Sequence, residues 1–487
     1  MIDPTKWKTA PLPHQTDGVR WIVEPQPGRQ ADVSALFDVM GSGKSKQVVD
    51  AACELYQAGE INTVVIFCPA AVRFGWADLE LGQIATHGWV PSTCQVLKSV
   101  DDFVPNLRKE DGLSWVAISY EWARSKTGLE KLWLELTGRK IFWIVDESHR
   151  LQTHNSTTTK ELTKLHDELG GRAVELSGTP MGNRYILSLW GQMRFLSKKI
   201  LPYENFYHYR ARYCQMGGFQ NKKVVKYFDT DQLTRLLKPY VLRRTNVKLP
   251  MKTYKVFEVP LSNETWKTYK QLRDDAVALL SEQPQDRLLT TNAMVQLLRL
   301  TQLTSGLIGG LDGEHARLIS TEKQDWLLNW LDELREQEES ARVVVWCRWR
   351  DEVPRLSYAL NQTHIKNMKL VGGQSERERE TTLRELKEGF GDVVVIGQPQ
   401  AGGSGVNAPT FRRQVFLSHV EALLDRQQAE DRLVRTDSTF AGVEVIDVLA
   451  TGPQGQQTVD HKIYRNVRAG ISMHTMTMAQ WRSALKD

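Results

Sequence analysis

The sequence predicts an α/β protein with two lobes in tandem, each built on a parallel β-sheet, and with helical insertions. Short apolar segments rich in Val and Ile form two groups, and helical stretches separate the segments within each group. Continuous apolar strands that alternate with helices are typical of parallel sheets covered on both faces. A mostly helical region at about 186–320 separates the groups, and 487 residues are too many for one ordinary core.

The expected strands can be placed directly on the sequence. The first lobe has them at 33–39, 63–69, 114–120, 141–147 and 173–180, and the second at 342–349, 364–373, 392–399, 413–419 and 443–450.

The first lobe is expected to occupy residues 1–250, with a basic helical protrusion at about 186–245. The second lobe is expected at 251–487. It should contain a helical insertion at about 260–320, in which 261–283 forms one long helix, and a C-terminal helix.

Composition excludes several classes of protein. Apolar residues make up 41% and charged residues 25%, which does not fit a disordered, collagen-like or coiled-coil chain. No apolar run approaches the ~20 residues of a membrane span, and the start of the chain has no apolar signal core. The five cysteines are scattered, so we expect neither a disulfide framework nor a zinc site. We therefore expect a cytoplasmic protein without a membrane partner.

Positive charge is concentrated in one segment. Residues 194–252 hold fourteen Lys and Arg but three Asp and Glu, while the whole chain carries +5. This concentration of charge favours a polyanion partner over a solvated face. Binding of that partner should depend strongly on salt and show little preference for sequence. Aromatic residues are interleaved with the charges. They could stack on single-stranded bases, but their helical spacing favours a small core for the protrusion.

A glycine-containing loop follows the first expected strand. The segment is Gly41-Ser42-Gly43-Lys44-Ser45, and a helix is expected directly after it. Such loops bring backbone N–H groups to phosphate oxygens at a helix N-terminus. Lys44 would reach the β- and γ-phosphates, and Ser45 would ligate Mg²⁺. The strict phosphate-loop pattern has Gly where this chain has Asp38, but the flanking strand and helix favour the nucleotide interpretation over a chance turn.

Two adjacent acids end the fourth expected strand. Asp146 suits Mg²⁺ through water, and Glu147 suits polarising an attacking water. A helix N-cap is the alternative. Because the carboxyl ends of parallel strands share one crevice, this pair and the Lys44 loop can face one nucleotide.

These motifs, in this order, resemble the Swi/Snf-related DNA translocases of helicase superfamily two. The resemblance covers nearly the whole chain. It includes LPHQTDGVRWI (12–22), CPAAVRFGWADLE (68–80), ISYEW (118–122), LSGTPMGN (176–183), VLRRTNVKLPMK (241–252), MVQLLRLTQLTSG (294–306), VVVWCRW (343–349), GGQSERERE (372–380), QAGGSGVNAPTF (400–411), RQQAEDRLVR (426–435) and QTVDHKIYRNV (457–467).

The resemblance implies two RecA-like lobes that hold one ATP with Mg²⁺. Gln15 would read the adenine, Gly405 and Asn407 would contact the nucleotide, and Arg432 and Arg435, three apart on an expected helix, would be arginine fingers. His149 would link the nucleotide to motif 177–180. Nucleic-acid contacts are implied for Arg73, Ser119, Tyr120, Arg243, Arg244, Trp346, Arg348, Gly372, Gly402 and Gly403.

The chain departs from the family pattern in one stretch. Residues 418–427 replace the family's acidic Trp-Asn-Pro segment, and Val434–Ser438 differ from the usual ending of the arginine motif. These changes put the coupling between the lobes in doubt more than the chemistry. Because no segment is left over for a histone reader, nucleosome remodelling is not expected.

The expected function is a DNA-dependent ATPase that translocates on duplex or branched DNA. Branch migration, fork remodelling or displacement of bound proteins would be its output, in repair or recombination in a bacterial or phage-infected cytoplasm, with a monomer in the free state. A strand-separating DNA or RNA helicase is one alternative. An ATP-gated DNA-binding clamp that does not move is another.

Overall fold

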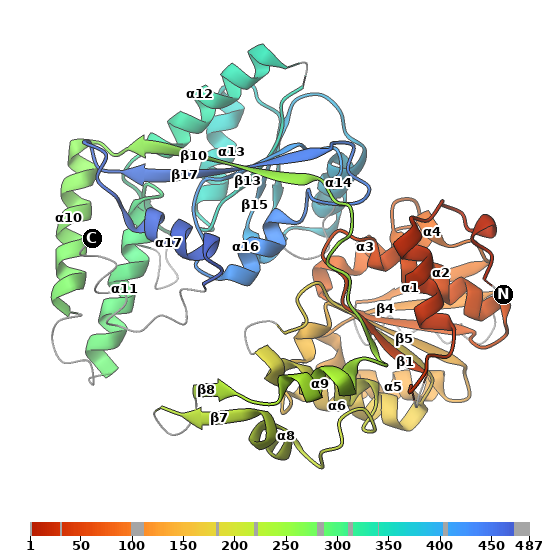
Figure 1. The fold of residues 1–487 in the computed structure, drawn as a ribbon. Helices are drawn as coiled ribbons and strands as arrows, with labels where there is room; N and C mark the ends of the chain where they lie inside the picture. Colours follow the sequence, from red (N-terminus) through yellow and green to blue (C-terminus); the bar gives the residue numbers. More distant parts are fainter. Residues whose placement is uncertain are drawn as a thin grey trace. The chain divides into compact units, whose positions relative to one another are not determined.

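In a computed structural model of the chain, two compact units are formed by Met1–Lys248 and Leu249–Asp487 (Figure 1). Each is an α/β unit on its own parallel sheet, which confirms the expected fold class. The structure describes residues 2–29, 32–98, 112–181, 185–218, 223–279, 287–309, 315–338, 340–402 and 408–471.

The first unit contains a seven-stranded parallel sheet in the order β3-β4-β2-β5-β6-β1-β9. Every expected strand of the first lobe is present, and β3 and β9 are added at the two edges. The strands are β1 (Val33–Leu36), β2 (Thr63–Cys68), β3 (Ser92–Leu97), β4 (Leu113–Ser119), β5 (Ile141–Asp146), β6 (Arg172–Leu176) and β9 (Val241–Leu242).

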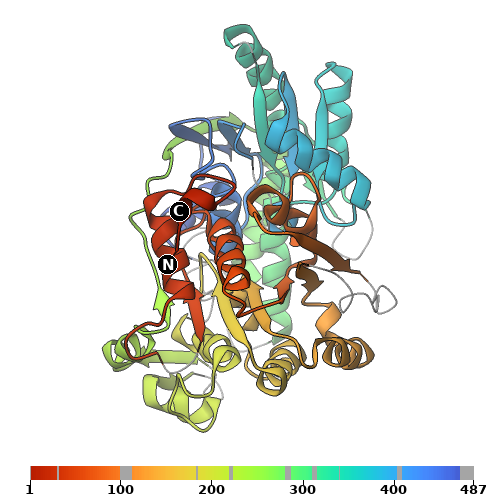
Figure 2. The same cartoon turned by 90° about the vertical axis from the view of Figure 1, so that its right-hand side faces the viewer.

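Helices cover both faces of this sheet (Figures 1 and 2). On one face lie α1 (Pro13–Val23), α2 (Lys44–Gln57), α3 (Arg73–Ala77) and α4 (Gln83–His87), and on the other α5 (Lys126–Leu136), α6 (Thr157–Leu169) and α7 (Leu189–Leu196). Short 3₁₀ turns occupy Pro4–Lys6, Ala70–Val72, Trp122–Arg124, Ser148–Leu151 and Tyr185–Ser188.

The basic protrusion is mixed rather than wholly helical. An antiparallel hairpin stands between its helices, a feature that the helical expectation missed. Tyr209 and Tyr213 are 0% exposed, and the Tyr203 hydroxyl donates to that of Tyr213 at 2.8 Å. The aromatic residues therefore form a small core, as expected, although Phe219 lies outside the described residues. The elements are α8 (Phe206–Tyr213), β7 (Cys214–Gly217), β8 (Lys223–Tyr227) and α9 (Thr230–Leu237).

The second unit contains a six-stranded parallel sheet in the order β10-β17-β16-β13-β15-β14. The ten-residue edge strand β10 was not expected from the sequence. Its polar and apolar residues are mixed, and most of its side chains stay exposed, so it lacks the continuous apolar signal of a buried strand. The strands are β10 (Met251–Pro260), β13 (Arg342–Trp346), β14 (Asn367–Leu370), β15 (Val393–Gly397), β16 (Arg413–Phe416) and β17 (Gly442–Thr451).

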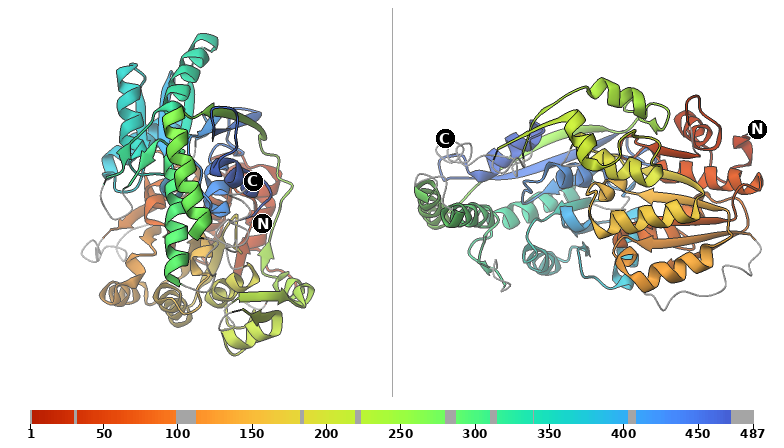
Figure 3. Two further views of the ribbon diagram at one scale, coloured as in Figure 1. Left: turned by 90° about the vertical axis from the view of Figure 1, so that its left-hand side faces the viewer. Right: turned by 90° about the horizontal axis from the view of Figure 1, so that it is seen from below.

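The helical insertion is a pair of neighbouring helices, α10 (Asn263–Leu279) and α11 (Arg287–Leu303), which run side by side (Figure 3). Trp266, Leu300 and Ile463 share one apolar core, so the C-terminal helix α17 (Val459–Arg468) packs on the insertion. The other elements are β11 (Leu307–Ile308), β12 (Arg317–Leu318), α12 (Glu322–Gln337), α13 (Glu352–Gln362), α14 (Glu376–Glu388), α15 (Pro399–Gly402) and α16 (Leu423–Glu430). Among the described residues, no helix combines the length and apolar character needed to cross a bilayer.

Candidate active site

The loop between β1 and α2 has the backbone expected of a phosphate loop. Gly41 (φ 74°) and Gly43 (φ 79°) adopt left-handed conformations, which glycine reaches at little cost. Gly43 caps α2, so the loop leads straight into a helix N-terminus that favours an anion. The Lys44 ammonium donates to the carbonyl oxygens of Asp38 at 2.8 Å and Val39 at 3.0 Å. These two contacts hold it across the loop, where its charge also acts on the nearby Asp146 carboxyl.

Helix α1 contacts this loop through two neighbouring side chains. The Gln15 amide donates to the Ser42 carbonyl oxygen at 3.3 Å, and the His14 Nε2 atom lies 2.8 Å from the same oxygen. Gln15 also accepts from the Leu12 backbone N–H at 2.9 Å and is 4% exposed. In this structure Gln15 supports the loop, and His14, which sequence reasoning missed, shares that role.

The two adjacent acids, Asp146 and Glu147, lie at the carboxyl end of β5, at the level where β1 ends. Leu36 and Asp146 both pair with Leu176 of the intervening strand β6, so the carboxyl ends of β1 and β5 are in register. Two strand spacings separate them, which is about 10 Å. The Lys44 loop and the acidic pair therefore lie at the same edge of the sheet, as expected, because of the register of β1, β6 and β5.

Asp146 is fixed from three directions. Its side chain accepts from the indole N–H of Trp76 at 2.9 Å and from the backbone N–H of Glu147 at 3.0 Å. The Tyr120 hydroxyl donates to the Asp146 carbonyl oxygen at 2.6 Å. Burial, followed by the neighbouring Glu147 charge, raises the pKa of the Asp146 carboxyl. A bound cation would oppose that shift, which suits a carboxylate that holds a metal.

Glu147 has a strained backbone. Its φ of 54° is left-handed, a conformation that non-glycine residues adopt rarely and mostly where function requires it. Its carboxylate lies 3.3 Å from the His149 Nδ1 atom. The left-handed backbone at Glu147 therefore ends the extended conformation of β5, and the Glu147 side chain leaves in a different direction from the side chains of that strand.

A connection from the turn after β5 to motif 177–180 runs through Gln192, and the expected role of His149 stays a prediction. The Ser148 hydroxyl donates to the Gln192 side-chain oxygen at 2.8 Å, and the Gln192 amide donates to the Pro180 carbonyl oxygen at 2.7 Å. A Cβ on Gly178 would lie 2.4 Å from the Met40 side chain, so the motif approaches the phosphate loop closely. A lone Gln in the apolar helix α7 is the sequence signal that could have identified this residue.

The donor set fits Mg²⁺. Ser45 in the first turn of α2 offers a hydroxyl, and Asp146 offers a carboxylate, both hard oxygen ligands. The described residues include no group of three or more His, Cys, Asp or Glu able to hold a metal by themselves. Mg²⁺ usually takes one or two protein carboxylates and completes its shell with water and phosphate oxygens.

The sequence matches a family model described as the SNF2-related domain over residues 14–305, more than half of the chain. The chain belongs to this family. A second model, the helicase conserved C-terminal domain, matches residues 322–437. The two matches fall largely in the two structural units.

Several relatives share this pattern. An ATP-dependent helicase of Mycoplasma genitalium is 25% identical over 81% of this chain and 36% of its own length. A putative ATP-dependent helicase/translocase of Bacillus subtilis is 24% identical over 93% of this chain and 47% of its own length. The SWI2/SNF2 ATPase core of Sulfolobus solfataricus in complex with dsDNA aligns with 100% of this chain and 96% of its own, at 17% identity and a TM-score of 0.42. The chain spans about a third of the length of the first two curated relatives it matches.

In the second unit of this SNF2-related chain, the two arginines are not on a helix. Helix α16 ends at Glu430, so Arg432 and Arg435 follow it in turns, and the expectation of one shared helix face is wrong. Arg432 is buried, and its Nε donates to the Gln428 carbonyl oxygen at 3.0 Å. Arg435 pairs with Asp437 at 2.9 Å.

The altered stretch before these arginines is tied into its own unit. Arg426 is 3% exposed in its side chain and pairs with Asp447 at 2.6 Å and Glu430 at 2.8 Å. Arg348 pairs with Glu421 at 2.6 Å. The replacements at 418–427 thus form internal ion pairs.

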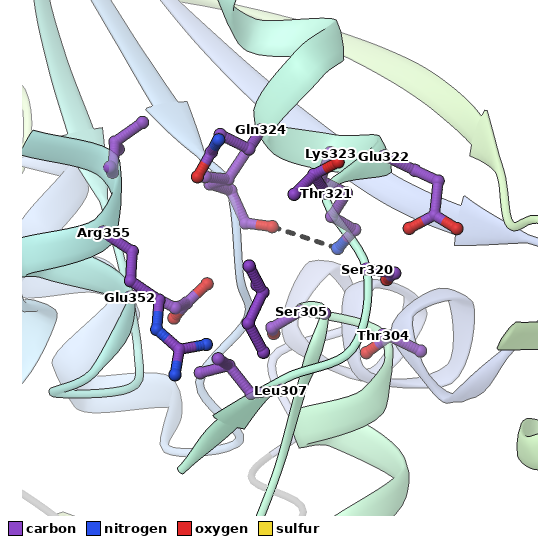
Figure 4. Close-up of a pocket in the computed structure, with 14 residues that line it drawn as sticks. Thr304, Ser305, Leu307, Ser320, Thr321, Glu322, Lys323, Gln324, Glu352 and Arg355 are labelled. Atoms are coloured by element: carbon purple, nitrogen blue, oxygen red, sulfur yellow. Dashed lines mark hydrogen bonds between the residues drawn. The ribbon is translucent and has the colours of Figure 1, made fainter. Parts of the chain in front are cut away.

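A small pocket of about 30 Å³ lies beside this stretch (Figure 4). Glu352 and Lys323 line it from α13 and α12, and Lys323 donates to the Leu417 carbonyl oxygen at 3.0 Å. Glu352 accepts from the Ser418 hydroxyl at 2.6 Å and the Trp349 N–H at 2.8 Å, which ties the end of β13 to the end of β16. Burial raises the pKa of the Glu352 carboxyl to about 7.

The residues expected to contact nucleic acid fall into two groups. Trp346 is 1% exposed with its indole N–H on Gln414, and Tyr120 and Ser119 are also buried. Arg244 and Arg348 are held in internal ion pairs. We no longer expect these five to touch DNA directly. Arg243 and Gly372 are exposed, and Arg73 is half-buried at the start of α3, where it donates to the Leu97 carbonyl oxygen at 2.9 Å.

The glycine-rich motif of the second unit is only partly described. Gly402 is the last residue of α15, a short helix that lies beside α16. Gly403, Gly405 and Asn407 lie outside the described residues, so their expected contacts stay predictions.

Proposed function

We propose that this SNF2-related chain is a DNA-dependent ATPase that moves along duplex DNA. The observation that carries the proposal is the register of β1, β6 and β5, which brings the Lys44 loop and the Asp146-Glu147 pair to the same edge of one sheet. A phosphate-binding loop, a metal carboxylate and a second carboxylate in that relation suit hydrolysis of a nucleoside triphosphate.

Each residue has a role in the proposed reaction. When ATP binds, its phosphates replace the backbone carbonyls that now hold the Lys44 ammonium. Ser45 and Asp146 would hold Mg²⁺, which would supply charge neutralisation at the phosphates. Glu147 takes the proton of the attacking water, a role that contributes about 10²–10⁴-fold in rate.

Arg432 and Arg435 are proposed to stabilise the transferred phosphoryl group, a contribution of about 10³–10⁵-fold where it has been measured. Arg435 must first exchange its ion pair with Asp437 for the phosphate. The second unit would therefore change locally during the cycle. Gly405 and Asn407 are retained as candidates for nucleotide contact.

The DNA surface is proposed from exposed cations. Four cations of the basic segment already pair with carboxylates: Arg194 with Asp167, Arg212 with Asp229, Arg244 with Asp38, and Lys252 with Glu430 and Asp431. DNA phosphates can bind the remaining exposed cations without reading the base sequence. Because this binding releases counterions, the affinity for DNA falls as the salt concentration rises. These exposed cations are Lys198, Lys199, Lys226, Arg235, Lys238, Arg243 and Lys248.

The deciding experiment compares ATPase rates with linear duplex, single-stranded, forked and four-way DNA, alongside displacement of a third strand from a triplex. Translocation requires DNA-stimulated hydrolysis together with triplex displacement. A preference for four-way or forked DNA would support branched substrates, and unwinding of a tailed duplex would support a strand-separating helicase. Absence of stimulation by every DNA would end the proposal.

An ATP-gated clamp is the second candidate. Arg435 is paired with Asp437, and Arg432 is buried, so neither is presented as a finger in this conformation. A clamp would hydrolyse ATP slowly and bind DNA in an ATP-dependent way, but it would not displace the triplex strand. We also propose that the free protein is a monomer and that it is located in the cytoplasm.

A further inference from the structure

The connector, residues 240–250, leads out of the first unit. It is hydrogen-bonded to the chain just before the phosphate loop. The backbone N–H groups of Ala35, Phe37 and Val39 donate to the carbonyl oxygens of Tyr240, Leu242 and Arg244 at 2.7, 2.8 and 3.1 Å. The connector therefore follows β1 and the residues after it as far as Val39, one residue before Met40. Residues 245–250 then lead into β10 of the second unit.

One guanidinium group fixes this junction. Asp38 is 0% exposed, and the Arg244 Nε atom lies 3.0 and 3.1 Å from its two carboxylate oxygens. The Arg244 Nη2 atom and backbone N–H also donate to Asp38, the latter at 2.9 Å. A buried carboxylate requires such a partner, because an unpaired charge in the interior is very costly.

The same guanidinium reaches two further elements of the nucleotide site. It donates to the Gln47 side-chain oxygen on α2 at 2.8 Å and to the His14 carbonyl oxygen on α1. A Cβ on Gly18 would lie 1.7 Å from that Gln47 oxygen and 2.9 Å from Arg244 Nη2. Glycine at position 18 therefore leaves room for this cluster.

Asp38 connects the cluster to the catalytic lysine. Its side chain holds Arg244, while its carbonyl oxygen accepts from the Lys44 ammonium at 2.8 Å. A shift of the connector that moves Asp38 must change the position of an acceptor of Lys44. Conversely, a nucleotide that draws Lys44 away removes one of the contacts on Asp38.

We propose that Arg244 is a positioning residue that couples the connector between the two units to the phosphate loop through Asp38. The idea rests on the proposed function, and it assigns to this arginine a mechanical role in place of DNA contact. Because coupling between two sites is reciprocal, the connector's position and nucleotide affinity then influence each other to the same extent.

The first test needs no DNA. Affinity for a fluorescent, non-hydrolysable ATP analogue with Mg²⁺ is measured for the wild type, Arg244→Gln, Asp38→Asn and the double variant. We expect each single variant to bind the analogue at least ~3-fold more weakly than the wild type. The double variant should bind no more weakly than the single variant with the larger loss, because residues in contact do not have additive effects. Unchanged affinities, or losses that simply multiply, would overturn the proposal whatever DNA does.

The second test measures coupling directly. DNA affinity is determined with and without the analogue, and we expect a ratio of about 5 or more in the wild type, the low end of common allosteric coupling. Arg244→Gln should bring the ratio toward one. A wild-type ratio of one would count against the proposed DNA-dependent function, while the first test would still decide the role of Arg244.

Arg29→Gln is the matched control. Arg29 also ties α1 to the segment before the connector, through the carbonyl oxygens of Trp21 and Pro239, whereas Arg244 contacts Asp38 and α2. It should keep the wild-type ratio even if its melting temperature falls. If Arg29→Gln loses the ratio as fully as Arg244→Gln, the role of Arg244 is merely structural. Should Arg244→Gln fail to fold, Arg244→Lys keeps a charge opposite Asp38 and should give an intermediate ratio.

Discussion

The phosphate loop of the first unit and the arginine-bearing stretch 418–438 of the second unit hold their key cations in different ways. Lys44 donates to two backbone carbonyl oxygens, which phosphate can replace, and its charge also acts on Asp146. Arg435 rests on a carboxylate, and Arg426 sits in a buried network of carboxylates. A phosphate can therefore take the place of the carbonyl oxygens on Lys44, whereas Arg435 must first give up its pair with Asp437. The five predictions that follow test these two regions, from the largest expected effect to the smallest.

Replacing Lys44 tests the region that is ready for its ligand. Lys44→Ala should abolish ATP turnover, because no other ammonium among the described residues contacts the loop carbonyls at Asp38 and Val39. DNA binding should remain largely intact in a filter-binding or anisotropy measurement. Near-normal hydrolysis by a folded variant would show that the loop is not a phosphate loop.

The paired arginines test the other region. Arg435→Ala and Arg432→Ala should each lower DNA-stimulated ATPase by more than ~10²-fold if they act as fingers, with ATP affinity changed much less. The control is Asp437→Asn, which frees Arg435 without removing it and should not slow the reaction. If a variant keeps more than about half the wild-type rate, the arginine that it replaces is not a finger. A surface ion pair, the alternative role, affects stability by only ~0–1 kcal/mol and does not contribute to the rate.

Glu147→Gln keeps the size of the side chain but removes the base. We expect binding of ATP with turnover slower by at least ~10²-fold, and accumulation of an ATP-bound form in a single-turnover experiment. An unchanged turnover number would reassign the base, and His149, 3.3 Å from the carboxylate, would then be the next residue to replace.

The buried network should govern stability rather than chemistry. Arg426→Gln leaves Asp447 without its main partner, and such a loss costs about 3–5 kcal/mol in unfolding free energy. The control is Lys255→Gln, whose pair with Glu444 is half exposed and should cost about 0–1 kcal/mol. Equal losses in urea denaturation would mean that burial of the Arg426 network does not matter.

Glu352 adds a pH dependence to the same region. Burial raises the pKa of Glu352 to about 7 from 4.5, so the folded protein binds the proton more tightly than the unfolded chain does. Its contribution to stability is therefore greatest below pH 4.5 and falls as pH rises toward 7, by up to about 3 kcal/mol. Glu352→Gln should remove this fall when unfolding is compared at pH 5 and pH 8. An identical pH profile in the variant would contradict the assignment.

Much of the local backbone around the candidate site was readable from sequence. A buried parallel strand needs a continuous apolar run, and a phosphate loop needs glycines with left-handed backbone between a strand and a helix, so β1, β5, Lys44 and the Asp146-Glu147 pair could all be placed in advance. Matching motifs gave the order of the remaining segments and the SNF2-related family.

Tertiary structure decided which partners each side chain has. Arg244 and Trp346 looked like DNA contacts because motifs show residue types but not burial, and the structure places one on Asp38 and the other in a core. The edge strand β10 was missed because a mostly exposed strand mixes polar and apolar residues and has no continuous apolar run. Gln192 and Trp76 gain their meaning only from contacts with residues far away in the chain. Sequence thus determined the local backbone and the chemical groups, whereas long-range packing determined which of those groups are held internally and which remain available to a ligand, because burial and pairing depend on segments that are distant in sequence.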